Sequence, residues 1–126
     1  MKVKICTSLE QSKRLVELGL DSKTADMFYK GSSNSDPYSG ARSIEFEDDY
    51  YEENIAWSLS RLLVIIRDYQ CVWLGANDVA SWVTEFNLGS GKHYTTDPTT
   101  DPLDAAYNCL VWLIENGKIN PKNITI

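Results

Sequence analysis

"DPLDAAYNCLVWLIENG" (101–117) has the start and stop signals of a helix and is apolar around almost its whole circumference. Asp101 suits the N-cap, where its carboxylate can accept a backbone N–H, and Pro102 suits the first helical position. Asn116-Gly117 suits the end, because glycine readily takes the left-handed conformation that closes many helices. The polar side chains in between share one narrow side: Asp104, Asn108 and Glu115. The stretch therefore predicts a helix that must be covered on more than one side.

The sequence leaves open two ways of covering this helix. The other helices of the chain can flank it on a sheet, which would bury it within one molecule. Alternatively, a second copy of the chain or another protein covers the remaining side, because large exposed apolar patches usually mark interfaces. A homodimer, the commonest closed assembly, is the main form of this second alternative. Trp112 is then a candidate binding residue.

Length, composition and charge narrow the class of protein. The 126 residues are 43% hydrophobic and 24% charged, which is typical of one folded domain spanning 1–126. The net charge is −6 and the twelve basic residues are scattered, so we expect no nucleic-acid partner. No apolar run approaches the roughly 20 residues of a membrane-spanning helix, and no secretory signal is visible. We therefore expect a cytoplasmic protein with no membrane contact.

Two further helices are indicated by caps and by apolar spacing. The first is predicted over 8–18, with Thr7 and Glu10 as a capping box and Gly19 at its end. Its expected buried stripe is Leu9, Leu15, Val16 and Leu18, and Leu20 is expected to contact Leu15. The second is predicted over 58–68, beginning at Trp57 or Ser58, with an apolar side made of Leu59, Leu62, Leu63, Ile66 and Tyr69.

The remaining segments favour short strands. Residues 27–30 and 42–47 alternate or are β-prone, and they flank a turn-rich stretch, which predicts a hairpin. A strand is predicted over 71–74, followed by a turn at "GAND" (75–78). Residues 79–86 fit a helix or a strand by spacing, and their Trp, Val, Thr and Phe favour the strand. The predicted fold is α+β, with about three helices packed on a short, largely antiparallel sheet.

Three stretches resemble one protein family: "TSLEQSKRLVELGLDSKTADMFY" (7–29), "AWSLSRLLVII" (56–66) and "TDPLDAAYNCLVWLIENGKI" (100–119). In this order they are similar to a family of small uncharacterised proteins of gut Bacteroidetes and of their phages and mobile elements. The resemblance implies an intracellular α+β protein that is often encoded near mobile-element genes. It implies no catalytic residues.

Few residues suggest chemistry. His93 lies in a Gly-rich segment, where a surface histidine is far commoner than a catalytic one. Cys6, Cys71 and Cys109 are widely separated, which favours three core residues over a metal or disulfide framework. The chain has no cluster with transition-metal spacing, so we expect no metal and no cofactor. "GSGK" (89–92) lacks the rest of a phosphate-binding loop and predicts a turn.

The acidic run "EFEDDYYEEN" (45–54) is the most concentrated charge in the chain. It lacks the spacing of a calcium loop, so a solvated face beside an edge strand is the preferred interpretation. The neighbouring aromatic residues Tyr50, Tyr51 and Trp57 are candidates for an interaction patch, with the core as the alternative for each of them.

Two hypotheses about function follow. The first is a non-catalytic binding or accessory protein that acts through protein–protein contacts. The alternative is a small enzyme that uses carboxylates from the acidic run or from Asp97, Asp101 and Asp104, or a domain that binds a small ligand. The absence of any nucleophile–base motif favours the first hypothesis.

Overall fold

The computed structural model describes residues 4–29, 40–44, 54–67, 71–78, 81–89, 92–95, 99 and 101–124. In this part of the chain the helices are α1 (Leu9–Glu17), α2 (Leu59–Arg67) and α3 (Pro102–Glu115), with 3-10 turns η1 (Ser22–Thr24) and η4 (Pro121–Asn123). The strands are β1 (Met27–Tyr29), β2 (Ala41–Ser43), β3 (Ile55–Ala56), β4 (Cys71–Asp78), β5 (Ser81–Gly89) and β6 (Lys92–Thr95).

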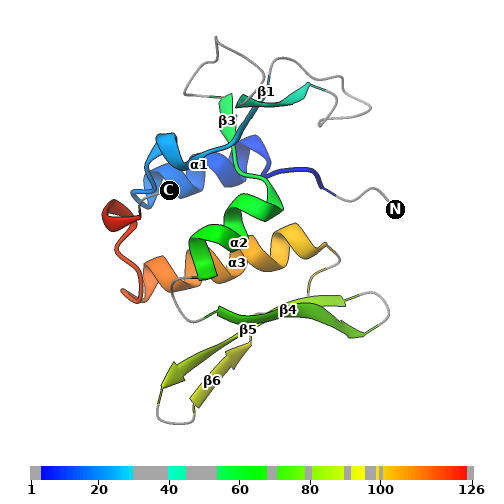
Figure 1. Ribbon diagram of the computed structural model, residues 1–126, viewed down its shortest axis with the longest axis vertical. Coiled ribbons are helices and arrows are strands. Elements are labelled where there is room, and N and C mark those ends of the chain that lie inside the picture. Colours follow the sequence, from blue (N-terminus) through cyan, green and yellow to red (C-terminus); the bar gives the residue numbers. More distant parts are fainter. Residues whose placement is uncertain are drawn as a thin grey trace.

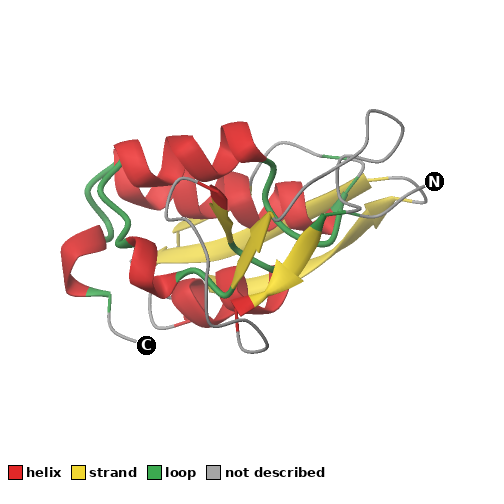
Figure 2. Ribbon diagram, turned by 90° about the horizontal axis from the view of Figure 1, so that it is seen from above, coloured by secondary structure: helices red, strands yellow, loops and turns green. Residues whose placement is uncertain are grey.

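The helices lie between two antiparallel sheets (Figure 1). The strand orders are β2-β1-β3 and β4-β5-β6, and α1 contacts β3 while α2 and α3 contact the second sheet. Viewed from above, strands lie over helices rather than beside them, so the elements form stacked layers (Figure 2). The α+β fold with three helices and an antiparallel sheet is confirmed, and a second sheet is added to it.

The chain itself covers α3 on two sides. α2 packs along α3, and β4 and β5 pack against a further side of α3, while α2 also contacts β4 (Figure 1). Elements of the same chain therefore cover this apolar helix. The side chains of α3 that are almost completely buried are Leu103, Ala105, Ala106, Cys109, Leu110 and Leu113. Tyr107 and Ile114 are only partly buried against this core.

The ends of α3 are those that the sequence predicted. Asp101 is the N-cap, and its Oδ1 accepts the Leu103 N–H at 2.8 Å. Pro102 occupies the first turn, Asn116 is the C-cap, and Gly117 has φ +69°. These positions depend on local backbone chemistry, which is why sequence signals alone locate them.

The first sheet confirms the predicted hairpin. β1 pairs with β2 in antiparallel register, with Phe28 opposite Arg42. On its other edge β1 pairs with β3, a two-residue strand that the sequence analysis missed because two residues show no alternation. β2 ends at Ser43 rather than continuing to 47, and residues 45–47 lie outside the described part.

The second sheet corrects one turn prediction. β4 continues through "GAND" to Asp78, and Gly75 and Ala76 pair with Val83 and Trp82 of β5. Cross-strand pairing therefore outweighs the turn preference of this segment. Residues 81–86 are strand rather than helix, as predicted, whereas 79 and 80 lie outside the described residues. Gly89 pairs with Lys92 where β5 meets β6, and residues 90 and 91 of the predicted turn lie outside the described residues.

α1 begins one residue later than its predicted capping box requires. Ser8 is the N-cap, its Oγ accepts the Gln11 N–H at 3.1 Å, and Gln11 Oε1 accepts the Ser8 N–H at 3.0 Å. The predicted pair of Thr7 and Glu10 is wrong because Thr7 Oγ1 is engaged elsewhere, accepting the Trp57 N–H at 3.0 Å. Successive residues of a helix project about 100° apart, so the one-residue shift changes the direction in which the capping side chains point.

The C-terminal end of α1 has the predicted form. Gly19 has φ +103°, and the Leu20 N–H donates to the Leu15 carbonyl at 3.0 Å, which is the long bond of a Schellman motif. Leu15 and Leu20 are both buried in the main core. A Cβ on Gly19 would lie 3.2 Å from Pro121 Cγ, so η4 packs closely against this turn.

α2 is preceded directly by Ser58, one of the two residues predicted at its entry. Ser58 Oγ accepts the Arg61 N–H at 3.1 Å, and Asp26 accepts hydrogen bonds from both the backbone N–H and the hydroxyl of Ser58. The buried side of α2 consists of Leu62, Ile65 and Ile66, with Leu59 and Leu63 partly buried. Tyr69 lies outside the described residues.

We expect Leu110→Ala to lower the free energy of unfolding by about 2–5 kcal/mol, because Leu110 is fully buried at the centre of α3. Leu9→Ala is the matched control, since Leu9 is 48% exposed on a helix and should cost less than about 1 kcal/mol. Urea titration of both variants makes the comparison. Equal losses would show that α3 is not the main source of the core.

Candidate protein-contact surface

The chain before α1 runs beside the start of α2. Cys6 forms an antiparallel bridge with Ser58, and the Thr7 N–H donates to the Trp57 carbonyl at 2.9 Å. The Cys6 side chain is fully buried, and in extended backbone the preceding side chain points the opposite way. Ile5 is accordingly 54% exposed, an unusual position for a large aliphatic side chain.

α1 turns two aliphatic side chains toward solvent. Its buried residues are Ser12 and Leu15, whereas Leu9 is 48% and Val16 46% exposed. Leu9 and Val16 are seven residues apart, so they lie on the same side of the helix about 10 Å from each other. We refer to this pair as the α1 strip. Among the described side chains, the large hydrophobic residues that are exposed all lie between positions 5 and 16.

The sequence analysis placed Leu9 and Val16 in the buried stripe of α1, and this was wrong. Lys13 lies between them on the same side of the helix, at the i+4 position from Leu9. A charged residue in the middle of an apolar stripe was the signal that this side meets water. Ser12, a small polar residue, occupies the buried side instead because its hydroxyl bonds with Thr7 Oγ1 at 2.7 Å.

The α1 strip faces away from α3. Gln11 Nε2 donates to Asp104 Oδ1 at 2.8 Å, and Arg14 forms an ion pair with Glu115 at 3.1 Å. At 100° per residue, Gln11 and Arg14 project from the side of α1 opposite Leu9 and Val16. The contacts with α3 therefore fix the rotation of α1 and leave the strip on the outside.

Charges of both signs border the strip. Glu10, Lys13 and Glu17 are exposed on its outer edge. None of the three forms an ion pair within the residues that the structure describes. A line of aliphatic side chains with charged groups along one edge has the composition of a protein-contact surface, with an apolar centre and a polar rim.

Trp57, a candidate for the interaction patch, belongs to the core. Its side chain is fully buried, and its Nε1–H donates to Thr24 Oγ1 at 3.0 Å. Buried tryptophans usually find such a partner for the indole N–H. Trp57 therefore cannot present its ring to another protein, and the core alternative holds for this residue.

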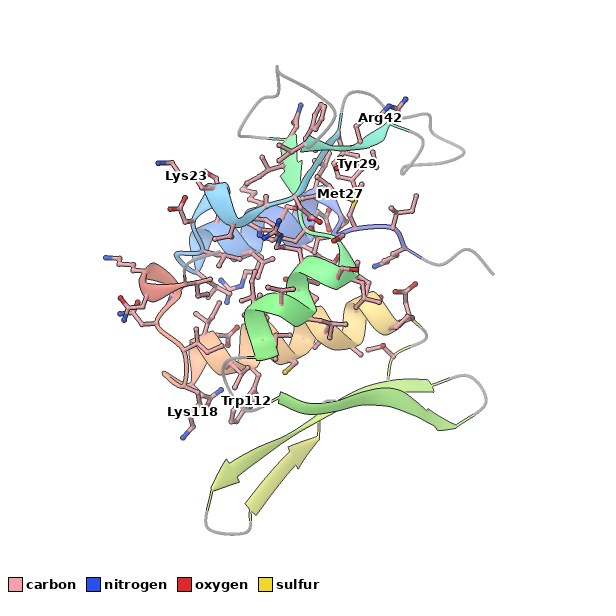
Figure 3. The ribbon with its side chains drawn as sticks, viewed as in Figure 1. Lys23, Met27, Tyr29, Arg42, Trp112 and Lys118 are labelled. Carbon is pink, nitrogen blue, oxygen red and sulfur yellow. The ribbon has the colours of Figure 1, made fainter. Side chains whose placement is uncertain are left out.

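The other aromatic candidates have different outcomes. Trp112 is partly buried against the main core and lies on the side of α3 that faces β4 (Figure 3). Its side chain is therefore partly covered by other elements of the same chain. Tyr50 and Tyr51 lie outside the described residues, as does the acidic run over 45–53.

The buried thiol of Cys6 is held as a neutral group. Its Sγ donates to Tyr29 Oη at 3.3 Å, and Tyr29 Oη donates in turn to the Thr7 carbonyl at 2.8 Å. Burial raises the pKa of the Cys6 thiol, the hydrogen bond with Tyr29 lowers it in part, and the carboxylate of Asp26 raises it further. Because the thiolate is the nucleophilic form, this environment makes Cys6 a structural residue.

Two of the carboxylates considered for catalysis, Asp101 and Asp104, bind the N-terminal segment to the start of α3. The Lys4 backbone N–H donates to Asp101 Oδ2 at 2.8 Å, and Lys4 Nζ forms an ion pair with Asp104 at 2.7 Å. Asp97 lies outside the described residues, and His93 lies on β6, where only its backbone is described. In the described ranges no group of three or more His, Cys, Asp or Glu side chains is placed to hold a metal ion.

Comparison with protein-family models, with curated proteins and with solved structures gives no match. Within the residues that the structure describes, no helix has the length and apolar character needed to cross a membrane.

We expect Thr7→Val to destabilise the fold by about 1–3 kcal/mol, because it leaves the buried Trp57 N–H without its acceptor while keeping the shape of the side chain. Ser12→Ala provides the second arm of a double-mutant cycle, since its hydroxyl bonds with Thr7 Oγ1. Coupling of at least about 0.5 kcal/mol in denaturant titrations would support one shared network. Strict additivity would contradict it.

Cys6 and Cys109 should react with a disulfide reagent only when the chain unfolds, because both side chains are fully buried. In a Cys71→Ser background, we expect native labelling to be at least about a thousandfold slower than labelling in urea. Absorbance of the released thiolate measures both rates. Native labelling within about tenfold of the unfolded rate would show that a thiol is accessible.

Proposed function

We propose that this chain is a non-catalytic binding protein that acts inside the cell through protein–protein contacts, as an accessory protein of a phage or mobile element. The cellular setting comes from the family resemblance and from the sequence. The mode of action rests on one structural observation, namely that the exposed large hydrophobic residues of the described chain are gathered in the N-terminal segment and α1.

The placement of these residues supports a binding role. About half of each of the side chains of Ile5, Leu9 and Val16 meets water, and that half contributes no burial energy to the fold. α1 is also held rigidly, with a capping box at its start, a Schellman motif at its end and contacts to α3. A fixed helix whose outer side carries aliphatic groups suits recognition by a complementary groove or helix.

The polar groups of the described chain support the same proposal. The Thr7 and Ser12 hydroxyls bond to each other inside the core, and Ser58 caps α2 while bonding to Asp26. Asp101 and Asp104 hold the N-terminal segment. Among the described residues, these hydroxyls and carboxylates are thus engaged in structural bonds, which supports a binding role for this part of the chain.

The test is a double variant, Leu9→Glu with Val16→Glu. Both positions are about half exposed, so the variant should stay folded, and glutamate should remove the affinity for an apolar partner surface. We expect affinity capture from the native host to retain a protein with the parent chain, and the purified partner to bind the double variant at least about tenfold more weakly in calorimetry.

Lys118→Glu is the control for added negative charge, because Lys118 is exposed beyond the end of α3, away from the strip. It should bind the partner as the parent does. Equal binding by the parent and the double variant would place the contact surface elsewhere on the molecule.

A further inference from the structure

The last turn of α3 ends on the dipeptide Asn116-Gly117, which is closed by a Schellman motif. The Gly117 N–H donates to the Ile114 carbonyl at 3.1 Å, and the Lys118 N–H donates to the Leu113 carbonyl at 2.9 Å. Glycine takes the required φ of +69° without strain. Both residues of the dipeptide are exposed. The end of α3 therefore meets water but is held by backbone hydrogen bonds.

An exposed Asn-Gly pair can undergo a covalent reaction of its own. The backbone nitrogen of Gly117, once its proton has left, attacks the side-chain carbonyl carbon of Asn116. The new C–N bond closes a cyclic imide, and the bond from the same carbon to the side-chain nitrogen breaks, so that ammonia leaves with the proton. Water then opens the imide at either carbonyl carbon. Aspartate or isoaspartate replaces the asparagine.

The sequence obstructs this reaction least at Asn116. It is the only asparagine of the chain that is followed by glycine, which has no side chain to shield the attacking nitrogen. Apart from its chain neighbours, no atom of the described residues lies within 4 Å of the position that a Cβ on Gly117 would occupy. Asn120 provides a contrast, because Pro121 has no N–H with which to form the imide.

The folded end of α3 opposes the same reaction. The Gly117 N–H is engaged with the Ile114 carbonyl, and Asn116 Nδ2 donates to the Trp112 carbonyl at 2.9 Å. With ψ of 11° at Asn116, the Gly117 nitrogen nearly eclipses the backbone nitrogen of Asn116, whereas ring closure needs it to eclipse Cβ. Attack therefore requires rotation about the Asn116 Cα–C bond, which breaks the hydrogen bond of Gly117 and opens the motif.

We propose that Asn116 is a site of spontaneous deamidation, and that opening of the last turn of α3 sets its rate. Local openings at helix ends need far less free energy than global unfolding. The product adds one negative charge to a net charge of −6, at the C-terminal end of a helix, where negative charge is unfavourable. Isoaspartate also lengthens the main chain of the turn by one carbon. Deamidation therefore opposes reclosing of the turn. This inference does not depend on the proposed function.

The test compares the rate of deamidation of the full chain in native buffer and in urea, at one pH and one temperature. Peptide chromatography with mass spectrometry separates the asparagine, aspartate and isoaspartate forms. We expect Asn116 to react at least about tenfold more slowly in the native chain than in urea, and Asn120 to stay unmodified in both. Equal rates for Asn116 would overturn control by the fold, and absence of reaction in urea would overturn the site.

Two matched variants separate local opening from global unfolding. Ile119 follows the motif, its side chain is buried in the main core, and its N–H donates to the Leu113 carbonyl at 3.2 Å. Leu103 is fully buried in the same core at the opposite end of α3. We expect Ile119→Ala to raise the native rate at least about threefold more than Leu103→Ala does. Both variants should react as the parent does in urea.

Circular dichroism establishes that both variants are folded. If either is not, the ratio of native to urea rates in the parent still decides whether the fold controls the site. Equal acceleration by two folded variants would show that Asn116 reacts through global unfolding, which would overturn the proposal.

Discussion

Burial of α3 on more than one side is the constraint from which the arrangement of α2 and the second sheet follows. A helix with one narrow polar side cannot rest on a single sheet without exposing aliphatic groups. α2 covers one side, and the β4–β5 pair covers another. The polar side that remains is the one from which Asp104 and Glu115 reach α1 and the N-terminal segment. The positions of α2 and of the second sheet thus follow from the sides of α3 that have to be covered.

A second constraint acts at Thr7, where three elements meet. Its backbone N–H and its hydroxyl both bond to the backbone of Trp57, and the hydroxyl also reaches Ser12. These bonds prevent Thr7 from capping α1, so Ser8 takes that position. The start of α1 and the buried position of Ser12 are consequences of this junction, and together they decide which side of α1 is exposed.

Sequence patterns predicted the features that depend on neighbouring residues. The caps of α3, the closing glycines and the start of α2 at Ser58 are local, and they were found. Two features that depend on distant partners were missed. "GAND" became strand because β5 pairs with it, and α1 rotated away from its predicted stripe because Trp57 and α3 bind it. For the candidate site, the aromatic residues drew attention while the exposed aliphatic ones did not, because Leu9 and Val16 resemble core residues until Lys13 between them is considered.

The bonds that join α3 to α1 and to the segment before it also bear on how the chain is made. Lys4 and Asp104 are 100 residues apart in sequence, and Arg14 and Glu115 are 101 apart. During synthesis α1 therefore emerges from the ribosome long before α3, which orients it. Gly19 likewise emerges long before Pro121, against which it packs. Contacts of such long separation slow folding. Throughout that interval the aliphatic side chains of α1, including Leu15, remain open to chaperones, so the N-terminal third of the chain is the part whose exposure during translation has to be managed.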